Sequence, residues 1–250
     1  MTVPNLRVPR VLAVQSDATA PPARGGAWIN QRGVEIEVVH AWQGDPLPDS
    51  LAGYDGLMVL GGAMGAEDDH VADWLPQLRR LMREAVEADH PVLGLCLGLQ
   101  LIAAACGGVV ALGQTPEFGL GEIELTAAGR ADNLMGHLPD RVRVPQFHRD
   151  GVPTPPPGAV VLATSALYPV QAIRMGTRVY AVQGHPEIDS GVLADWGSFE
   201  EADILEGSGR SLEHAVDELR AAEDELRDSW QPFFEAWAAL VIDHAAVSSE

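Results

Sequence analysis

Apolar residues in the first half of the chain occur in short continuous runs that alternate with stretches of helical periodicity. Four such runs predict buried strands, at residues 10–15, 34–41, 56–62 and 91–96. Between the last two, apolar residues recur at helical spacing over residues 71–88. Alternating strands and helices are typical of an α/β fold, so we expect an open, mostly parallel sheet flanked by helices.

The second half is richer in predicted strands, which are separated by turn residues. They are expected at residues 121–126, 141–148, 159–165, 169–176 and 178–184. The proline-rich stretch 152–159 is expected to be a loop. Beyond it, periodicity predicts one helix over residues 211–230 and a final helix that Pro232 opens. We expect residues 1–250 to form a single domain that ends in C-terminal helices at 211–247.

Composition limits the partners that this chain is expected to bind. Its 36 acidic and 16 basic residues give a net charge of -20, which repels nucleic acid and anionic lipid. No stretch approaches the ~20 apolar residues of a membrane span, and the N-terminus lacks the apolar core of a signal peptide. With only 2 cysteines and no disulfide framework, the chain is expected to be cytoplasmic.

The stretch PVLGLCLGLQLIAAACGG, residues 91–108, places Cys96 between Gly94 and Gly98. An apolar strand, a tight turn and then a helix, with a nucleophile at the turn, form a nucleophile elbow. Such an elbow exposes the thiol at a helix N-terminus, where the thiolate is favoured, and leaves the Leu97 N–H free to bind an oxyanion. Taken alone, this stretch also fits a buried core cysteine.

A partner for the thiol is predicted in YAVQGHPEID, residues 180–189. Proline restricts the residue before it to an extended conformation, so His185 and Glu187 project to the same side. Glu187 can then hold one imidazole nitrogen while the other faces Cys96. A surface loop is the alternative for this motif alone, but the elbow and the motif together favour a Cys–His–Glu site.

A third motif is VLGGAMG, residues 59–65, with paired glycines at a strand end. Gly61 or Gly62 can supply a second oxyanion donor, although a plain turn has the same sequence. Together the three motifs resemble the class I, triad-type glutamine amidotransferases, a flavodoxin-like fold. The resemblance is strongest to the glutaminase domain of GMP synthase and its stand-alone relatives, and it extends from about residue 8 to 190.

The resemblance implies that Cys96 attacks the side-chain amide of glutamine, with His185 as the base and Glu187 orienting it. It implies oxyanion donors at Leu97 and at the Gly61–Gly62 loop, and release of ammonia from a thioester that water then hydrolyses. No cofactor and no metal are implied. The chain shows no ATP-binding motif, so an acceptor for the ammonia is expected on a separate synthetase chain.

Substrate contacts are also implied by the resemblance. Gln100 is expected to help bind the amino-acid end of glutamine. Phe147 and His148 in QFHRDG are expected to contact the substrate, partly through backbone, and Gly61 in the glycine loop is also expected to bind it. The segment EFGLGEIELT, residues 117–126, is given no chemistry. Relatives commonly have an aromatic residue where this chain has Gly184, and the glycine is expected to widen the pocket.

Two rival functions are consistent with the same residues. A γ-glutamyl peptidase or hydrolase would use the same site on larger γ-glutamyl amides without a partner. A catalytically silent regulatory or binding subunit would keep the fold without the activity, but an intact triad argues against it. The acids of residues 65–74 fit no strong metal motif and are expected to favour a helix start. Cys106 is expected to be a packed apolar residue.

Overall fold

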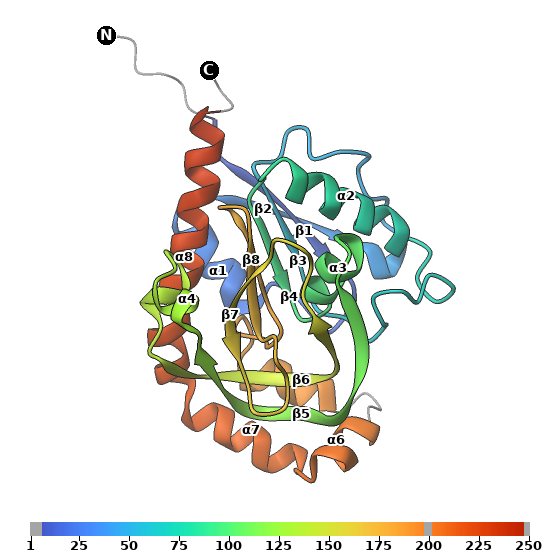
Figure 1. Cartoon of the computed structure of the whole chain (residues 1–250), viewed down its shortest axis with the longest axis vertical. Helices are drawn as coiled ribbons and strands as arrows, with labels where there is room; N and C mark the ends of the chain where they lie inside the picture. The colour runs from blue at the N-terminus through green and yellow to red at the C-terminus, as the bar shows by residue number, and fades with distance from the viewer. Residues whose placement is uncertain (1–6, 198–201, 248–250) are drawn as a thin grey trace.

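The computed structural model describes residues 7–197 and 202–247, and the strands within them form one nine-stranded sheet (Figure 1). The strand order is β2-β1-β3-β4-β9-β8-β7-β5-β6. The strands are β1 (Arg10–Gln15), β2 (Glu35–His40), β3 (Gly56–Val59), β4 (Val92–Leu95), β5 (Val109–Leu125), β6 (Arg141–Thr154), β7 (Val160–Thr164), β8 (Ala172–Met175) and β9 (Val179–Val182). Neighbours from β2 to β9 in this order are parallel, and those from β9 to β6 are antiparallel. The predicted class, an open α/β sheet flanked by helices, is confirmed.

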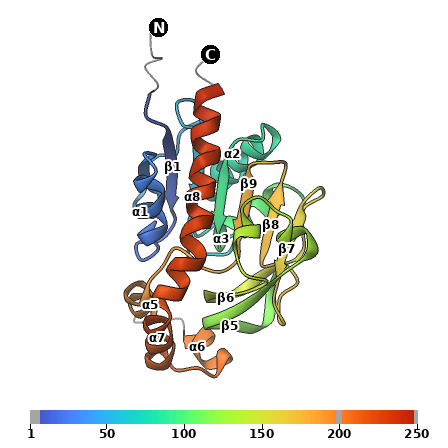
Figure 2. The ribbon, with the colours of Figure 1, turned by 90° about the vertical axis from the view of Figure 1, so that its left-hand side faces the viewer.

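Helices cover both faces of the parallel half of the sheet. The helices are α1 (Ala23–Gln31), α2 (Leu75–Glu87), α3 (Leu97–Ala105), α4 (Ala127–Arg130), α5 (Ser190–Gly197), α6 (Ala202–Ser208), α7 (Leu212–Ala221) and α8 (Glu223–Val247), with short 3-10 turns η1 (Ala41–Gln43) and η2 (Met135–His137). One face packs against α1 and α8, and the other against α2 and α3 (Figure 2). Successive β1 residues face opposite ways, so Val11 joins the first core and Leu12 the second.

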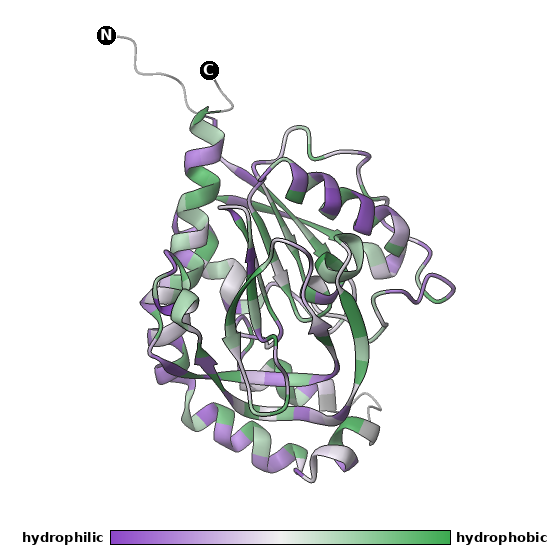
Figure 3. Ribbon diagram, in the orientation of Figure 1, coloured by the Kyte–Doolittle hydropathy of each residue, from purple (hydrophilic) through white to green (hydrophobic). Residues whose placement is uncertain are grey.

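The hydropathy of the surface follows from this layering. Hydrophobic residues lie along the central strands, whereas the outer sides of α2 and α7 are largely hydrophilic (Figure 3). Across residues 7–197 and 202–247, no helix combines the length and the apolar character that crossing a membrane requires.

The antiparallel half differs from the sequence prediction. β5 is 17 residues long and begins at Val109, where no strand was predicted, and β6 continues to Thr154, into the stretch expected to be a loop. The first part of β5 is largely exposed, and its register with β6 shifts between Leu112 and Glu117. An exposed, bulged strand has no continuous apolar run, so the pattern that predicts strands is lost there.

The C-terminal helices divide at a different place from the one predicted. α7 ends at Ala221, and α8 continues from Glu223 through Pro232 to Val247, so the prediction that Pro232 opens a helix is wrong. Proline removes one backbone hydrogen bond from a helix. The helix continues because four aromatic side chains around that position are fully buried against the sheet: Trp230, Phe233, Phe234 and Trp237.

Candidate active site

Three neighbouring parallel strands end at the same edge of the sheet and bring the predicted motifs together. Gly61 follows β3, Cys96 follows β4 and His185 follows β9, and these strands are adjacent in the order β3-β4-β9. Parallel strands place their carboxyl ends at one edge, which is where open α/β sheets bind ligands. The sheet order therefore gathers residues that are far apart in the sequence.

Cys96 adopts a strained conformation between β4 and α3. Its φ of 52° and ψ of -103° are unusual for a residue with a side chain, and its N–H donates to the Val182 carbonyl at 2.9 Å. A Cβ on Gly98 would lie 2.4 Å from the Val59 carbonyl oxygen, and one on Gly94 would lie 2.7 Å from the Gly98 carbonyl carbon. The flanking glycines thus permit the close strand–helix approach that the elbow prediction requires.

The thiol is more enclosed than the elbow motif predicts. The Cys96 side chain is 5% exposed, and Nε2 of Gln183 donates to its Sγ at 3.6 Å. His185 also forms a hydrogen bond with Cys96. The reactive group is therefore held by side chains from the end of β9, and Gln183 is a contact that the sequence prediction missed, although it lies in the same motif as His185.

The imidazole of His185 is fixed by several neighbours. Nδ1 faces Oε1 of Glu187 at 2.8 Å, and the His185 N–H donates to the Pro145 carbonyl at 2.7 Å. The ring meets Trp196 of α5 edge-on with 4.5 Å between centroids, and a Cβ on Gly61 would lie 2.7 Å from Cε1. His185 and Glu187 are 3% and 1% exposed, so the pair is buried and oriented by its surroundings.

The neighbours of His185 favour its protonated form. Burial by itself lowers the pKa of His185, but the charges of Cys96 and Glu187 and hydrogen bonds to both outweigh it and raise the pKa to about 10. Because Nδ1 faces Glu187, Nε2 is the atom left for Cys96. The geometry therefore supports a protonated His185 next to Cys96.

The expected oxyanion donors lie next to the elbow. Leu97 begins α3, and the first N–H groups of a helix have no partner within it. A Cβ on Gly62 would lie 3.0 Å from Cδ2 of Leu97, so the Gly61–Gly62 loop contacts both Leu97 and His185. The structure therefore brings Gly61, Gly62 and Leu97 around Cys96, and their role as oxyanion donors stays a prediction.

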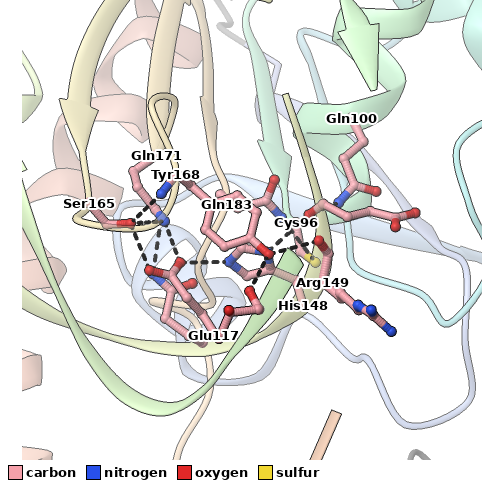
Figure 4. A network of polar contacts seen from close by, with 12 residues as sticks. Cys96, Gln100, Glu117, His148, Arg149, Ser165, Tyr168, Gln171 and Gln183 are labelled. Atoms are coloured by element: carbon pink, nitrogen blue, oxygen red, sulfur yellow. Dashed lines mark hydrogen bonds and ion pairs between the residues drawn. The ribbon is translucent and has the colours of Figure 1, made fainter. Parts of the chain in front are cut away.

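Gln100 and His148, which were expected to bind substrate, meet at one carbonyl group. Nε2 of Gln100 donates to the Asp150 carbonyl oxygen at 3.2 Å, and Nδ1 of His148 faces the same oxygen at 2.9 Å. Nε2 of His148 faces Oε2 of Glu117 at 3.0 Å. Both side chains are buried, with Gln100 4% and His148 3% exposed. Glu117, which was given no chemistry, thus contacts one candidate substrate-binding residue, His148, and is connected to Gln100 through His148 and the Asp150 carbonyl (Figure 4).

Phe147 projects from the other face of β6. Its ring packs against Phe118 and Trp196, with centroids 5.3 Å and 5.5 Å away. Because neighbouring strand residues point to opposite faces, Phe147 and His148 have different surroundings. Phe147 approaches the candidate triad only through Trp196, which contacts His185. The sequence prediction did not include Trp196, and no local motif marks it.

The space beside Gly184 is filled. A Cβ at this position would lie 2.7 Å from Cγ2 of Val144 and 3.0 Å from the Pro145 carbonyl oxygen. The expectation that Gly184 widens the pocket is therefore wrong at this position, because β6 packs against the backbone where a side chain would stand.

The remaining candidates have other contacts. In the acidic loop, Oδ2 of Asp68 accepts from the Gly65 N–H at 2.7 Å, and both carboxylate oxygens of Asp69 pair with Arg79 at 2.8 Å. Cys106 is half-buried against the core formed with α2 and α3, and burial raises the pKa of its thiol.

Comparison with known proteins identifies a family. The model of the family described as "Glutamine amidotransferase class-I" matches residues 28–195. The chain is 37% identical over 163 residues to a GMP synthase [glutamine-hydrolyzing] of Aeropyrum pernix, which covers 64% of this chain and 29% of that protein. It is 33% identical over 153 residues to Gamma-glutamyl peptidase 4 of Arabidopsis thaliana, which covers 60% of each. A glutamine amido transferase structure from Methylobacillus flagellatus superposes with a TM-score of 0.82 at 26% identity, covering 95% of both chains.

Proposed function

The chain belongs to the class I glutamine amidotransferase family, and from that premise we propose that it hydrolyses the side-chain amide of glutamine through a thioester on Cys96. The observation that carries the proposal is the strained elbow of Cys96 beside the buried His185–Glu187 pair. A thiolate next to an imidazolium combines a nucleophile with a proton donor, as amide cleavage requires.

The proposed reaction has two steps. Sγ of Cys96 forms a bond to the amide carbon, and the carbonyl electron pair moves onto oxygen, where the N–H groups of Leu97 and Gly62 stabilise it. The intermediate collapses as the C–N bond breaks, with Nε2 of His185 giving its proton to the leaving ammonia. His185 then takes a proton from water, whose oxygen attacks the thioester carbon. The C–S bond breaks, glutamate leaves, and the thiolate of Cys96 is restored beside the protonated His185. Glu187 keeps the imidazole oriented throughout.

Substrate binding is proposed for the groups around the elbow. Gln100 lies about one helical turn beyond Cys96, and its carbonyl partner at Asp150 places His148 beside it. The amino-acid end of the substrate is proposed to bind beside Gln100. Gly61 and the backbone near Phe147 and His148 are proposed to contact it there. Each oxyanion donor is expected to contribute ~10²–10³-fold in rate.

We propose that the ammonia passes to a synthetase on another chain. The chain matches 29% of a GMP synthase, a protein named for a glutamine-hydrolysing synthesis, and this supports a glutaminase that serves a partner. We place the reaction in the cytoplasm and in a single domain formed by residues 1–250, because both cysteines are free thiols and because one sheet spans the described residues.

The match to a γ-glutamyl peptidase favours a second candidate. In that case the same Cys96 thioester forms, but the leaving group is an amino acid or a larger amine, and no synthetase is needed. The two candidates differ only in the group that His185 protonates.

Glutamate release by the purified chain tests both candidates. Glutamine and a panel of γ-glutamyl dipeptides are supplied, with Cys96→Ala as the control. Release from glutamine that Cys96→Ala loses supports the amidotransferase. Faster cleavage of dipeptides than of glutamine supports the peptidase.

Full activity in Cys96→Ala would contradict both candidates. Release from no substrate, together with a Cys96 that a glutamine-analogue alkylator does not modify, would favour a silent regulatory subunit.

A further inference from the structure

Glu117 is a partly buried carboxylate with three hydrogen-bond donors. Oε1 accepts from Oγ of Ser165 at 2.7 Å, and Oε2 accepts from Nε2 of Gln171 at 2.5 Å and faces Nε2 of His148 at 3.0 Å. The side chain is 14% exposed. Burial alone raises the pKa of Glu117, but the hydrogen bonds from His148, Ser165 and Gln171 and the charge of His148 lower it. Glu117 is therefore ionised at neutral pH.

His148 is one of its partners. Nε2 faces the Glu117 carboxylate, and Nδ1 faces the Asp150 carbonyl oxygen. Both ring nitrogens therefore face oxygen atoms that accept hydrogen bonds. With both nitrogens occupied, His148 has no atom free for proton transfer.

The first connection from Glu117 reaches Gln100. Nδ1 of His148 and Nε2 of Gln100 both donate to the Asp150 carbonyl oxygen, at 2.9 Å and 3.2 Å. The carbonyl that orients the Gln100 amide is thus held by the His148 ring, and that ring is held by Glu117. Gln100 lies in α3, one turn beyond the nucleophile.

The second connection reaches the thiol. Gln171 donates from Nε2 to Glu117, and its main-chain carbonyl accepts from the Gln183 N–H at 2.8 Å. Nε2 of Gln183 donates to Sγ of Cys96 at 3.6 Å. Figure 4 shows the contacts of Glu117 with Ser165, Gln171 and His148, and Gln183 extended toward Cys96. One connection therefore ends at Gln100 and the other at Cys96, and these two residues lie one helical turn apart.

We propose that Glu117 is a positioning residue of the active site, the centre of a buried network that aligns the Cys96 thiol and the Gln100 amide for the same substrate. It does not touch substrate in this role. This inference rests on the proposed function, because a positioned Gln100 matters only if the elbow binds a γ-glutamyl compound.

The test compares Glu117→Gln with Glu122→Gln in a Cys106→Ser background, so that Cys96 is the remaining thiol. Glu122 lies on the same strand but is exposed, and it pairs with Arg141 at 3.3 Å. Three quantities are measured: KM and kcat for glutamate release, and the rate at which iodoacetamide alkylates Cys96. Loss of hydrogen bonds to a charged group predicts a ~10-fold higher KM and slower alkylation in Glu117→Gln. Glu122→Gln should match the parent in all three.

Two further variants separate the connections. His148→Asn breaks the link to Gln100 and removes one of the three partners of Glu117, so KM should rise as in Glu117→Gln while Cys96 alkylation slows less than in Glu117→Gln. Ser165→Ala removes one donor to Glu117 and should cause a smaller change, in the same direction, than Glu117→Gln. It also serves as the test if Glu117→Gln fails to fold.

A folded Glu117→Gln protein with the KM and alkylation rate of Glu122→Gln would overturn the proposal and leave Glu117 a packing residue. Alkylation does not depend on turnover. If the parent releases glutamate from no substrate, the proposed function fails, and unequal alkylation of Glu117→Gln and Glu122→Gln still supports the network around Cys96.

Discussion

His185 and His148 are both buried, and each faces a glutamate: Nδ1 of His185 lies 2.8 Å from Oε1 of Glu187, and Nε2 of His148 lies 3.0 Å from Oε2 of Glu117. The remaining ring nitrogen distinguishes them. In His185 it forms a hydrogen bond with the Cys96 thiol, and in His148 it faces a carbonyl oxygen. A thiol exchanges a proton with imidazole and a carbonyl oxygen does not, so only the first pair is suited to acid–base chemistry.

The two pairs also differ in the part of the fold that builds them. His185 and Glu187 follow β9, in the parallel half of the sheet, and are 2 residues apart. His148 and Glu117 are 31 residues apart on β6 and β5, and they meet only because those strands pair. The comparison suggests that the parallel half supplies the reacting groups and the antiparallel half supplies their alignment.

The largest expected effect comes from exchanging each histidine for asparagine. His185→Asn removes the proton carrier and should lower kcat for glutamate release by ~10³-fold. His148→Asn should raise KM by ~10-fold with kcat nearly unchanged, because it disturbs only an aligning hydrogen bond. Steady-state kinetics with glutamine measure both, and thermal unfolding checks that each variant is folded. Equal losses of kcat in the two variants would erase the distinction between the pairs.

The second prediction concerns pH. The charges of Cys96 and Glu187 raise the pKa of His185 to about 10, so its imidazolium persists as pH rises toward that value. Glu187→Gln removes one of these charges, which lowers the pKa and moves the alkaline limb of kcat/KM to lower pH. The loss of orientation should also lower the rate at neutral pH by ~10²-fold.

Glu117→Gln is the matched comparison for the pH profile. Its carboxylate faces His148 and not His185, so it should raise KM and leave the alkaline limb in place. An alkaline limb that stays fixed in Glu187→Gln, or that moves equally in both variants, would show that the two glutamates are equivalent.

The difference between the pairs also explains what the sequence could reveal. Cys96 and the His185–Glu187 pair are local motifs, because a turn between a strand and a helix and a proline after His185 set their geometry within a few residues. The parallel strands β1, β3, β4 and β9 were predictable because they are buried on both faces and therefore read as continuous apolar runs.

The Glu117–His148 pair has no such local signature. It depends on the register of β5 with β6, which shifts between Leu112 and Glu117 because extra residues bulge from one strand. The contact of Gln183 with Cys96 depends in turn on β9 lying next to β4, although four strands lie between them along the chain. Neither the bulge in β5 nor the adjacency of β4 and β9 can be predicted from the apolar pattern alone.

The smallest effect is expected where the two halves of the sheet meet. Gly184 lies between Gln183 and His185, and a Cβ there would overlap Cγ2 of Val144 and the Pro145 carbonyl oxygen, at 2.7 Å and 3.0 Å. Gly184→Ala should therefore push β6 away and lower the free energy of unfolding by ~1–3 kcal/mol, as overpacking does.

Urea unfolding of Gly184→Ala measures this loss, and Gly191→Ala in α5 is the control. The nearest atom to a Cβ on Gly191 is Oδ1 of Asp189 at 3.1 Å, and alanine is the better helix former, so this change should be neutral or slightly stabilising. Because the His185 N–H donates to the Pro145 carbonyl, the displaced strand should also disturb His185 and lower kcat by a few fold. An unchanged free energy of unfolding in Gly184→Ala would mean that β6 can move at this position without loss of stability. The antiparallel half of the sheet would then not be rigidly packed against the parallel half.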